Sequence, residues 1–252
     1  MTRPFRALLM VALLVALPGA VGNAAAAEIE VLSAGAVEPG LAPAVQAFRS
    51  ASSQGVSITY ATAPRLAERL DRGDAAHLLI GPQGMLEALA RDGRLAGQPF
   101  PLGRVGVGMA IRPEVPVPMV EDAEGLRRAV LQAQTLVYNR ASTGLYLDRL
   151  FERLGLTTAV APKARRYPTG AGVMEHLLRG SGQELGFGAI TEIRMVRELR
   201  YLGPLPSELQ SYTTYSAALT PGAPAAAEAL LRWLLGPEAR AAFDAVGIEP
   251  AR

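Results

Sequence analysis

The sequence has 252 residues, half of them hydrophobic, with 25 basic and 23 acidic side chains and a formal net charge of +2. This near balance, with no basic stripe carrying interleaved aromatic residues, gives no indication of a nucleic-acid partner. The absence of cysteine excludes disulfides, thiol catalysis and thiolate metal sites.

The first 27 residues have the layout of a secretory signal peptide. Two arginines and no acid precede an apolar stretch over residues 7–17, and small residues follow up to Ala27. The apolar stretch is too short to cross about 30 Å of hydrocarbon, which needs about 20 residues. We therefore expect export to the periplasm with cleavage near Ala27, and no lipid anchor, because no cysteine follows. The two arginines account for the whole charge excess.

Strand-length apolar runs alternate with helical periods in the first half of the chain. The pattern predicts strands at 29–34, 56–61, 77–80 and 105–111, and helices at 39–53, 64–70 and 85–91. Such alternation is typical of an α/β protein with a largely parallel sheet. Prolines at 113, 116 and 118 then interrupt regular pairing, which indicates a lobe boundary.

The second half repeats the alternation. It predicts helices at 121–134, 144–154 and 172–179, strands at 135–139, 163–167, 185–190 and 213–219, and two final helices at 224–235 and 237–245. If the final helices pack on the first half, the chain crosses between two lobes twice, near 105–112 and 210–219. We therefore expect an α/β fold of two lobes, each a mainly parallel sheet flanked by helices, with residues 28–108 and 216–252 in lobe I and 109–215 in lobe II.

The sequence lacks the motifs of an enzyme. Its two histidines, His77 and His176, have no second histidine at metal-ligand spacing, and no nucleophile elbow or dinucleotide fingerprint is present. We expect no catalytic activity, no metal and no cofactor.

Small, hydroxylated or amide residues recur where a predicted strand gives way to a helix. They are Ser33, Ala34 and Gly35, then Thr62 and Ala63, then Asn139, Ser142 and Thr143, and finally Thr169 and Gly170. Arg65 and Arg140 lie beside two of these groups. In open α/β sheets, ligands lie beyond the carboxyl ends of the strands, where helix N-termini offer unpaired N–H groups to anions. Each loop alone is equally typical of ordinary helix capping, but four together predict an anion site.

The residues resemble the periplasmic substrate-binding proteins of ABC transporters, within them the molybdate-binding branch, along the whole mature chain. The resemblance rests on four segments, namely residues 32–37, 66–80, 143–155 and 184–188. It implies two lobes of the periplasmic-binding-protein fold, a ligand in the cleft, closure on binding and a membrane permease as partner. A monomer is expected.

The oxyanion-binding residues of that branch are replaced by alanine in this sequence. The family's two serines and late tyrosine fall on Ala36, Ala63 and Ala189. Losing three donors at about 1.5 kcal/mol each would weaken oxyanion binding about a thousandfold. We therefore expect a small organic anion, clamped by Arg65 or Arg140 with hydroxyl donors from both lobes. Molybdate or tungstate binding, an extracytoplasmic sensor of the same fold, and a secreted enzyme are the alternatives.

Overall fold

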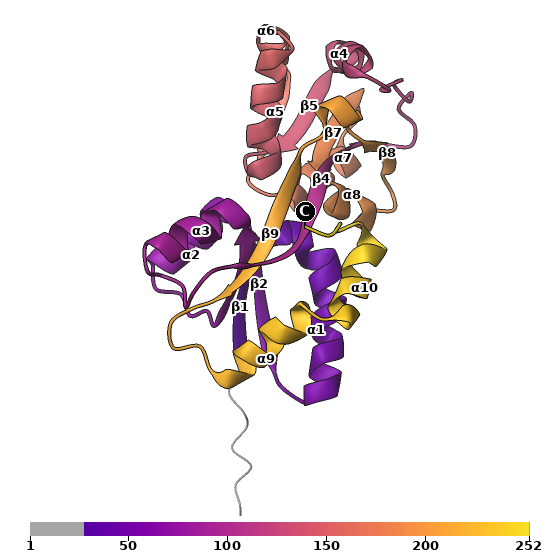
Figure 1. The fold of residues 1–252 in the computed structure, drawn as a ribbon. Helices are drawn as coiled ribbons and strands as arrows, with labels where there is room; N and C mark the ends of the chain where they lie inside the picture. The colour runs from indigo at the N-terminus through magenta and orange to yellow at the C-terminus, as the bar shows by residue number, and fades with distance from the viewer. Residues whose placement is uncertain (1–27, 252) are drawn as a thin grey trace, which may run out of the picture.

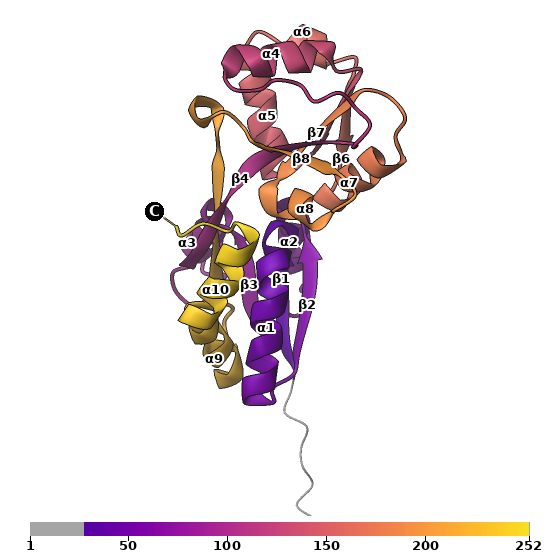
Figure 2. The same ribbon diagram turned by 90° about the vertical axis from the view of Figure 1, so that its right-hand side faces the viewer.

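The computed structural model describes residues 28–251, so the predicted signal peptide at 1–27 lies outside the described residues. The described chain forms two α/β lobes joined by a pair of long strands (Figures 1 and 2). Over residues 28–251, no helix combines the length and the apolar character that crossing a bilayer demands.

The first lobe is built from the N-terminal β-α-β-α-β unit. Its elements are β1 (Ile29–Ala34), the short 3-10 helix η1 (Gly35–Val37), α1 (Glu38–Ser52), β2 (Val56–Ala61), α2 (Ala63–Asp71), β3 (Leu78–Pro82) and α3 (Gln83–Arg91). β1 pairs in parallel with both β2 and β3, so the carboxyl ends of all three strands lie at one edge. This is the parallel arrangement that the alternating pattern predicts.

The second lobe repeats the arrangement. Its elements are α4 (Ala123–Gln132), β5 (Thr135–Asn139), α5 (Ser142–Arg153), α6 (Thr157–Val160), β6 (Ala164–Tyr167), α7 (Gly170–Arg179), β7 (Glu184–Ala189), α8 (Ile190–Met195), β8 (Arg200–Pro204) and the 3-10 helix η2 (Ser207–Leu209). β5 pairs in parallel with β6 and β7, which again brings strand ends to one edge.

Two strands connect the lobes, as the sequence predicts. β4 (Phe100–Ile111) pairs with β9 (Tyr212–Leu219) up to Gly106 and with β7 and β8 from Val107 onward. The strand order is β2-β1-β3-β9-β4-β7-β5-β6, with β8 also beside β4. These crossover pairs are antiparallel, so the sheet is mixed, with parallel pairs confined to β1, β2 and β3 and to β5, β6 and β7. The exact lobe boundaries at 108/109 and 215/216 stay a prediction.

The C-terminal helices pack on the first lobe. α9 (Ala225–Leu234) and α10 (Pro237–Val246) lie against α1 (Figure 2). Trp233 Nε1 donates a 3.0 Å hydrogen bond to the Ala44 carbonyl, and its ring meets Phe48 edge-on. Gly40 permits the close approach of α10, because a Cβ there would lie 2.6 Å from Phe243 Cδ1. The first lobe therefore gains its core from both ends of the chain.

Three elements were missed by the sequence patterns. The predicted strand at 185–190 runs straight into α8, because Ile190 starts that helix with no intervening loop. β8 carries arginine, glycine and proline, which are atypical of a strand, and its backbone is held by pairing with β4. α6 is a single turn, which periodicity does not reveal.

A buried ion pair joins Arg112, the residue after β4, to Glu184, the first residue of β7. Arg112 contacts the carboxylate of Glu184, and the two side chains are 7% and 9% exposed. Arg112 also donates to the carbonyls of Leu177 and Gly182, at the end of α7 and in the loop before β7. The guanidinium therefore fixes the end of α7 that lies away from the cleft.

We expect Arg112→Ala to destabilise the protein by about 3 kcal/mol, because it removes the guanidinium from a buried carboxylate, which keeps only the His176 ring, 3.2 Å from its Oε1. The measurement is urea unfolding. Glu114→Gln is the matched control, since Glu114 contacts Arg112 from a position 68% exposed and should change stability by less than about 1 kcal/mol. Equal effects of the two substitutions would contradict this role for the pair.

Candidate functional site

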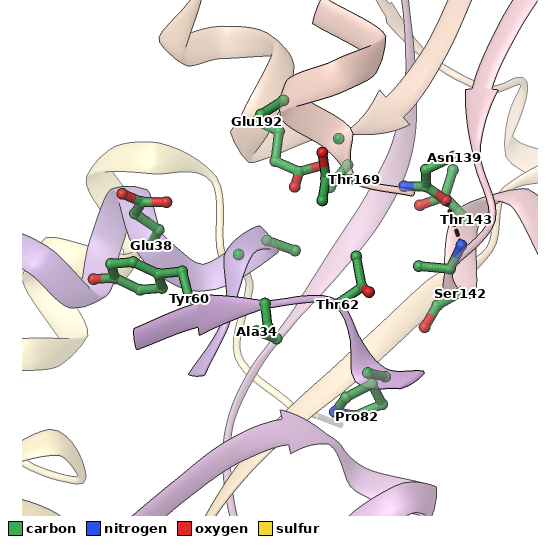
Figure 3. Close-up of a pocket in the computed structure, with 18 of the residues that line it drawn as sticks. Ala34, Glu38, Tyr60, Thr62, Pro82, Asn139, Ser142, Thr143, Thr169 and Glu192 are labelled. Carbon is green, nitrogen blue, oxygen red and sulfur yellow. Dashed lines mark hydrogen bonds between the residues drawn. The ribbon is translucent and has the colours of Figure 1, made fainter. Parts of the chain in front are cut away.

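A cavity lies between the lobes where the ends of the parallel strands face each other (Figure 3). Its volume is about 180 Å³, which is about the volume that six water molecules take up in liquid water. The lining residues are Ala34, Gly35, Ala36, Glu38, Tyr60, Ala61, Thr62, Ala63, Pro82, Asn139, Ala141, Ser142, Thr143, Thr169, Gly170, Ala171, Ala189, Glu192 and Tyr215. A space of this size suits a small molecule.

The start of α5 presents two backbone N–H groups to the cavity. Asn139, at the end of β5, accepts hydrogen bonds from the N–H groups of Ala141 and Gly144 through its side-chain oxygen. The first N–H groups of a helix have no partner within the helix. Because Asn139 caps the third residue of α5, the N–H groups of Ser142 and Thr143, both lining the cavity, are left for a ligand.

The start of α7 repeats this geometry. Thr169 Oγ1 accepts a 3.1 Å hydrogen bond from the N–H of Gly172, the third residue of the helix. The N–H groups of Gly170 and Ala171, its first two residues, are thereby left at the cavity wall. Across the cleft, Thr62 precedes α2 and its side chain makes no capping bond to that helix. The starts of α2, α5 and α7 therefore all lie at this cavity.

The structure brings together most of the residues predicted from the sequence. Those that line the cavity are Ala34, Gly35, Thr62, Ala63, Asn139, Ser142, Thr143, Thr169 and Gly170. Ser33 does not line it: in β1, successive side chains point to opposite faces, and its fully buried hydroxyl donates to the Ala34 carbonyl.

The two arginines of the expected anion clamp lie outside the cavity lining. Arg65 is on the exposed face of α2, where its side chain is 62% exposed and lies 3.5 Å from Glu68. Arg140 is exposed in the loop after β5, where its N–H donates to the Tyr167 carbonyl. Neither cation reaches the wall, because each belongs to the turn of its helix or loop that faces solvent.

The cavity holds two carboxylates that the sequence analysis did not single out, Glu38 of α1 and Glu192 of α8. A Cβ on Gly170 would lie 2.1 Å from Glu192 Oε2, so the carboxyl rests directly on the start of α7. In the other lobe, a Cβ on Gly35 would lie 3.6 Å from Glu192 Oε1. Glu192 therefore sits where the two lobes meet.

Burial decides the protonation of Glu192. Desolvation raises its pKa from 4.5 to about 7, and the negative charge of Glu38 adds to this, while a hydrogen bond with the Ala189 backbone opposes it. Burial also raises the pKa of Glu38. Among the described residues that line the cavity there is no lysine, arginine or histidine to hold either carboxyl ionised.

Two tyrosines complete the wall. Burial, with Glu38 nearby, raises the pKa of Tyr60 to about 12, and burial raises the pKa of Tyr215 still further from its ordinary value. Both phenols therefore stay protonated. Tyr60 Oη is buried with no hydrogen-bond partner among residues 28–251. A ligand atom or a water molecule would satisfy it.

The sequence carries only a weak signal for the two glutamates and the two tyrosines of the cavity wall. Glu38 is the first residue of α1, and Glu192 occupies the third position of α8, a helix that the sequence patterns do not predict. Glutamate at a third helical position is a common capping residue. Tyr60 and Tyr215 lie within strands, where tyrosine is ordinary.

A family model described as bacterial extracellular solute-binding protein matches residues 29–249. The chain belongs to this family. The match spans both lobes and the cavity between them, so the two-lobed binding-protein fold expected from the resemblance is confirmed.

Solved structures share the fold at low sequence identity. The periplasmic molybdate-binding protein of Azotobacter vinelandii is 17% identical with a TM-score of 0.76, over 89% of this chain and 100% of that one. PEB3, a Campylobacter jejuni protein, was solved with L-phospholactate bound; it is 11% identical with a TM-score of 0.71, over 88% of this chain and 100% of that one.

A curated relative from a Pseudomonas species has the name aconitate isomerase. It is 29% identical to this chain over 233 residues, which cover 88% of this chain and 87% of the relative. This chain, which belongs to a family of solute-binding proteins, is therefore also similar in sequence to a protein that is named for catalysis on a tricarboxylate.

The raised pKa of Glu192 predicts a pH-dependent stability. Between pH 4.5 and 7 the native state binds more protons than the unfolded state, so the free energy of unfolding falls as pH rises through this window. Above pH 7, the raised pKa of Glu192 lowers the free energy of unfolding by about 3 kcal/mol relative to its value below pH 4.5. We expect Glu192→Gln to remove this loss and to be more stable than wild type at pH 8 but not at pH 4.

Urea unfolding at the two pH values provides the measurement. Glu228→Gln, at an exposed position on α9, is the control and should follow wild type at both. A stability difference between wild type and Glu192→Gln that does not change with pH would mean that the carboxyl has an ordinary pKa.

Proposed function

We propose that the protein binds a small organic anion with at least one carboxylate group in the cleft, and delivers it to the membrane permease of an ABC importer. The observation that carries this proposal is the pairing of α5 and α7, whose first two N–H groups are left uncapped at one cavity. Each helix start also carries about half a positive charge. The protein acts as a monomer in the periplasm.

The rest of the wall supports an organic ligand over a bare oxyanion. Alanines occur at seven lining positions, namely Ala34, Ala36, Ala61, Ala63, Ala141, Ala171 and Ala189. Three of these, Ala36, Ala63 and Ala189, are the positions where the resemblance assigns hydroxyl donors to the molybdate-binding branch. Methyl groups there offer contacts to carbon atoms and none to oxygen. A tetrahedral oxyanion would lose donors that an organic acid does not need.

The names of the relatives agree with a negatively charged ligand. Molybdate and L-phospholactate are anions, and the curated relative is named for aconitate. Because the cavity wall has no cation, recognition by backbone N–H groups, hydroxyls and neutral phenols is the arrangement that fits these ligands. A neutral Glu192 would donate a hydrogen bond of the same kind.

We expect Ala171→Pro to weaken ligand binding about tenfold or more, because proline at the second position of α7 removes one N–H donor to a charged group. The helix should survive, since proline is tolerated in a first turn and α2 already carries Pro64 at its second position. The measurement is calorimetric titration of the best ligand from a thermal-shift panel of di- and tricarboxylates, L-phospholactate, molybdate and tungstate.

Ala226→Pro, at the second position of α9 and remote from the cleft, is the matched control and should bind as wild type. A panel in which molybdate or tungstate stabilises the protein and no carboxylate does would overturn the proposed ligand class. Unchanged affinity in Ala171→Pro would overturn the role of the helix start.

The position of the two arginines predicts that they are dispensable for binding. Because Arg65 and Arg140 do not line the cavity, the double substitution to alanine should keep affinity within threefold, or about 0.7 kcal/mol. The same titration measures it. A loss of tenfold or more would restore the arginine clamp expected from the sequence, with both side chains swinging into the cleft on closure.

A further inference from the structure

In a simple site for an anion, the carboxyl of Glu192 is useful only while it is neutral and donates a hydrogen bond. It lies in a cavity that, on the proposed function, holds an anion, and a second carboxylate, Glu38, lines the same space. Two ionised carboxylates would repel the ligand, and no basic side chain among the described lining residues compensates for them. A group that costs affinity in this way is retained at sites where it acts on the ligand.

The neighbours of Glu192 meet the requirements of proton transfer at a carbon next to a carboxylate. Such a reaction needs a base that can accept and return a proton, and hydrogen-bond donors for the negative charge that grows on the carboxylate oxygens. Glu192 rests against Gly170, at the start of α7, whose first two residues, Gly170 and Ala171, line the cavity. Because the first N–H groups of a helix have no partner within it, base and donors share a space of about 180 Å³, in which Figure 3 shows Glu192 beside Thr169, the residue before α7.

We propose that Glu192 is a catalytic residue that moves a proton between two carbons of a bound unsaturated di- or tricarboxylate, so that the cleft isomerises this ligand as well as binding it. This inference rests on the proposed carboxylate site. It departs from the expectation that the chain is no enzyme, which followed from sequence motifs alone. Proton transfer by one carboxyl has no such motif.

The step balances without a cofactor. Glu192 as carboxylate takes a proton from a carbon that is both next to a carboxylate and allylic to the carbon–carbon double bond. The electrons of that C–H bond form a new double bond, and the charge spreads over the ligand carboxylates. The neutral Glu192 then returns the proton to the far carbon of the original double bond. The product is an isomer, and nothing is oxidised or reduced.

The surroundings suit both halves of this cycle. A base that must give its proton back works best when its pKa lies near the operating pH, and burial raises the pKa of Glu192 to about 7. The titratable groups that influence it are Glu38 from α1 and Tyr215 from β9, and burial raises the pKa values of both. Glu175 and Arg179 of α7 border the groove that adjoins Glu192 on its outer side.

The test is NMR in D₂O with the purified protein and cis-aconitate, trans-aconitate or itaconate, each of which has an allylic carbon next to a carboxylate. We expect isomerisation, or deuterium uptake at that carbon, for the acids that bind. Glu192→Gln should lose the rate by a factor of about 100 or more while binding stays within threefold, since general-base catalysis contributes about 10²–10⁴-fold. Glu228→Gln, remote from the cleft, should keep the full rate.

The outcomes separate the two proposals. Binding by wild type without isomerisation or deuterium uptake overturns catalysis and leaves the binding function standing, as does an undiminished rate in Glu192→Gln. Failure of wild type to bind any acid overturns the carboxylate site and the catalysis with it. If Glu192→Gln does not fold, Glu192→Asp, which withdraws the carboxyl by one methylene, should bind normally and lose the rate at least tenfold.

Discussion

The site depends on one constraint: the N–H groups in the first turn of a helix need partners from outside that helix. Parallel pairing of β1 with β2 and β3, and of β5 with β6 and β7, brings the helix starts of each lobe to one edge. The crossover strands β4 and β9 then set the two edges against each other. Asn139 and Thr169 satisfy only the third residue of α5 and of α7. The remaining donors converge on a space that an anion fits.

The elements that frame the site could be predicted because their patterns are local. The strand ends at Ala34 and Ala61 are followed at once by Gly35 and Thr62, and the strand end at Asn139 is followed closely by Ser142 and Thr143; all four line the cavity as expected. The two arginines lie outside the cavity lining for a geometric reason: nearness in sequence to a strand end does not fix which way a long side chain points. Arg65 is on the solvent face of the same helix whose first residue, Ala63, lines the cavity.

Glu192 could not be found in this way, because its role arises from tertiary contacts. Its helix, α8, follows β7 without a loop, so the sequence offers no boundary there. Its environment comes from Gly35 and Glu38 in one lobe and Gly170 in the other, residues far apart along the chain. The sequence around Gly170 predicts only a helix start, yet the carboxyl of Glu192 fits there because Gly170 has no Cβ. This contact exists only in the folded structure, so the sequence pattern does not reveal it.

Alanine at the three positions where the resemblance places hydroxyl donors links these observations. Methyl groups at Ala36, Ala63 and Ala189 give the wall contacts to carbon, and its polar atoms come from the starts of α5 and α7 and from Glu38, Tyr60, Thr62, Glu192 and Tyr215. If donors stood at those three positions, a buried carboxyl would compete with an oxyanion for them. With methyl groups there, a ligand needs carbon atoms as well as carboxylates to fill the space. Glu192, in the same cavity, can then lie beside a carbon atom of the ligand, which is the position from which a carboxyl can exchange a proton with it.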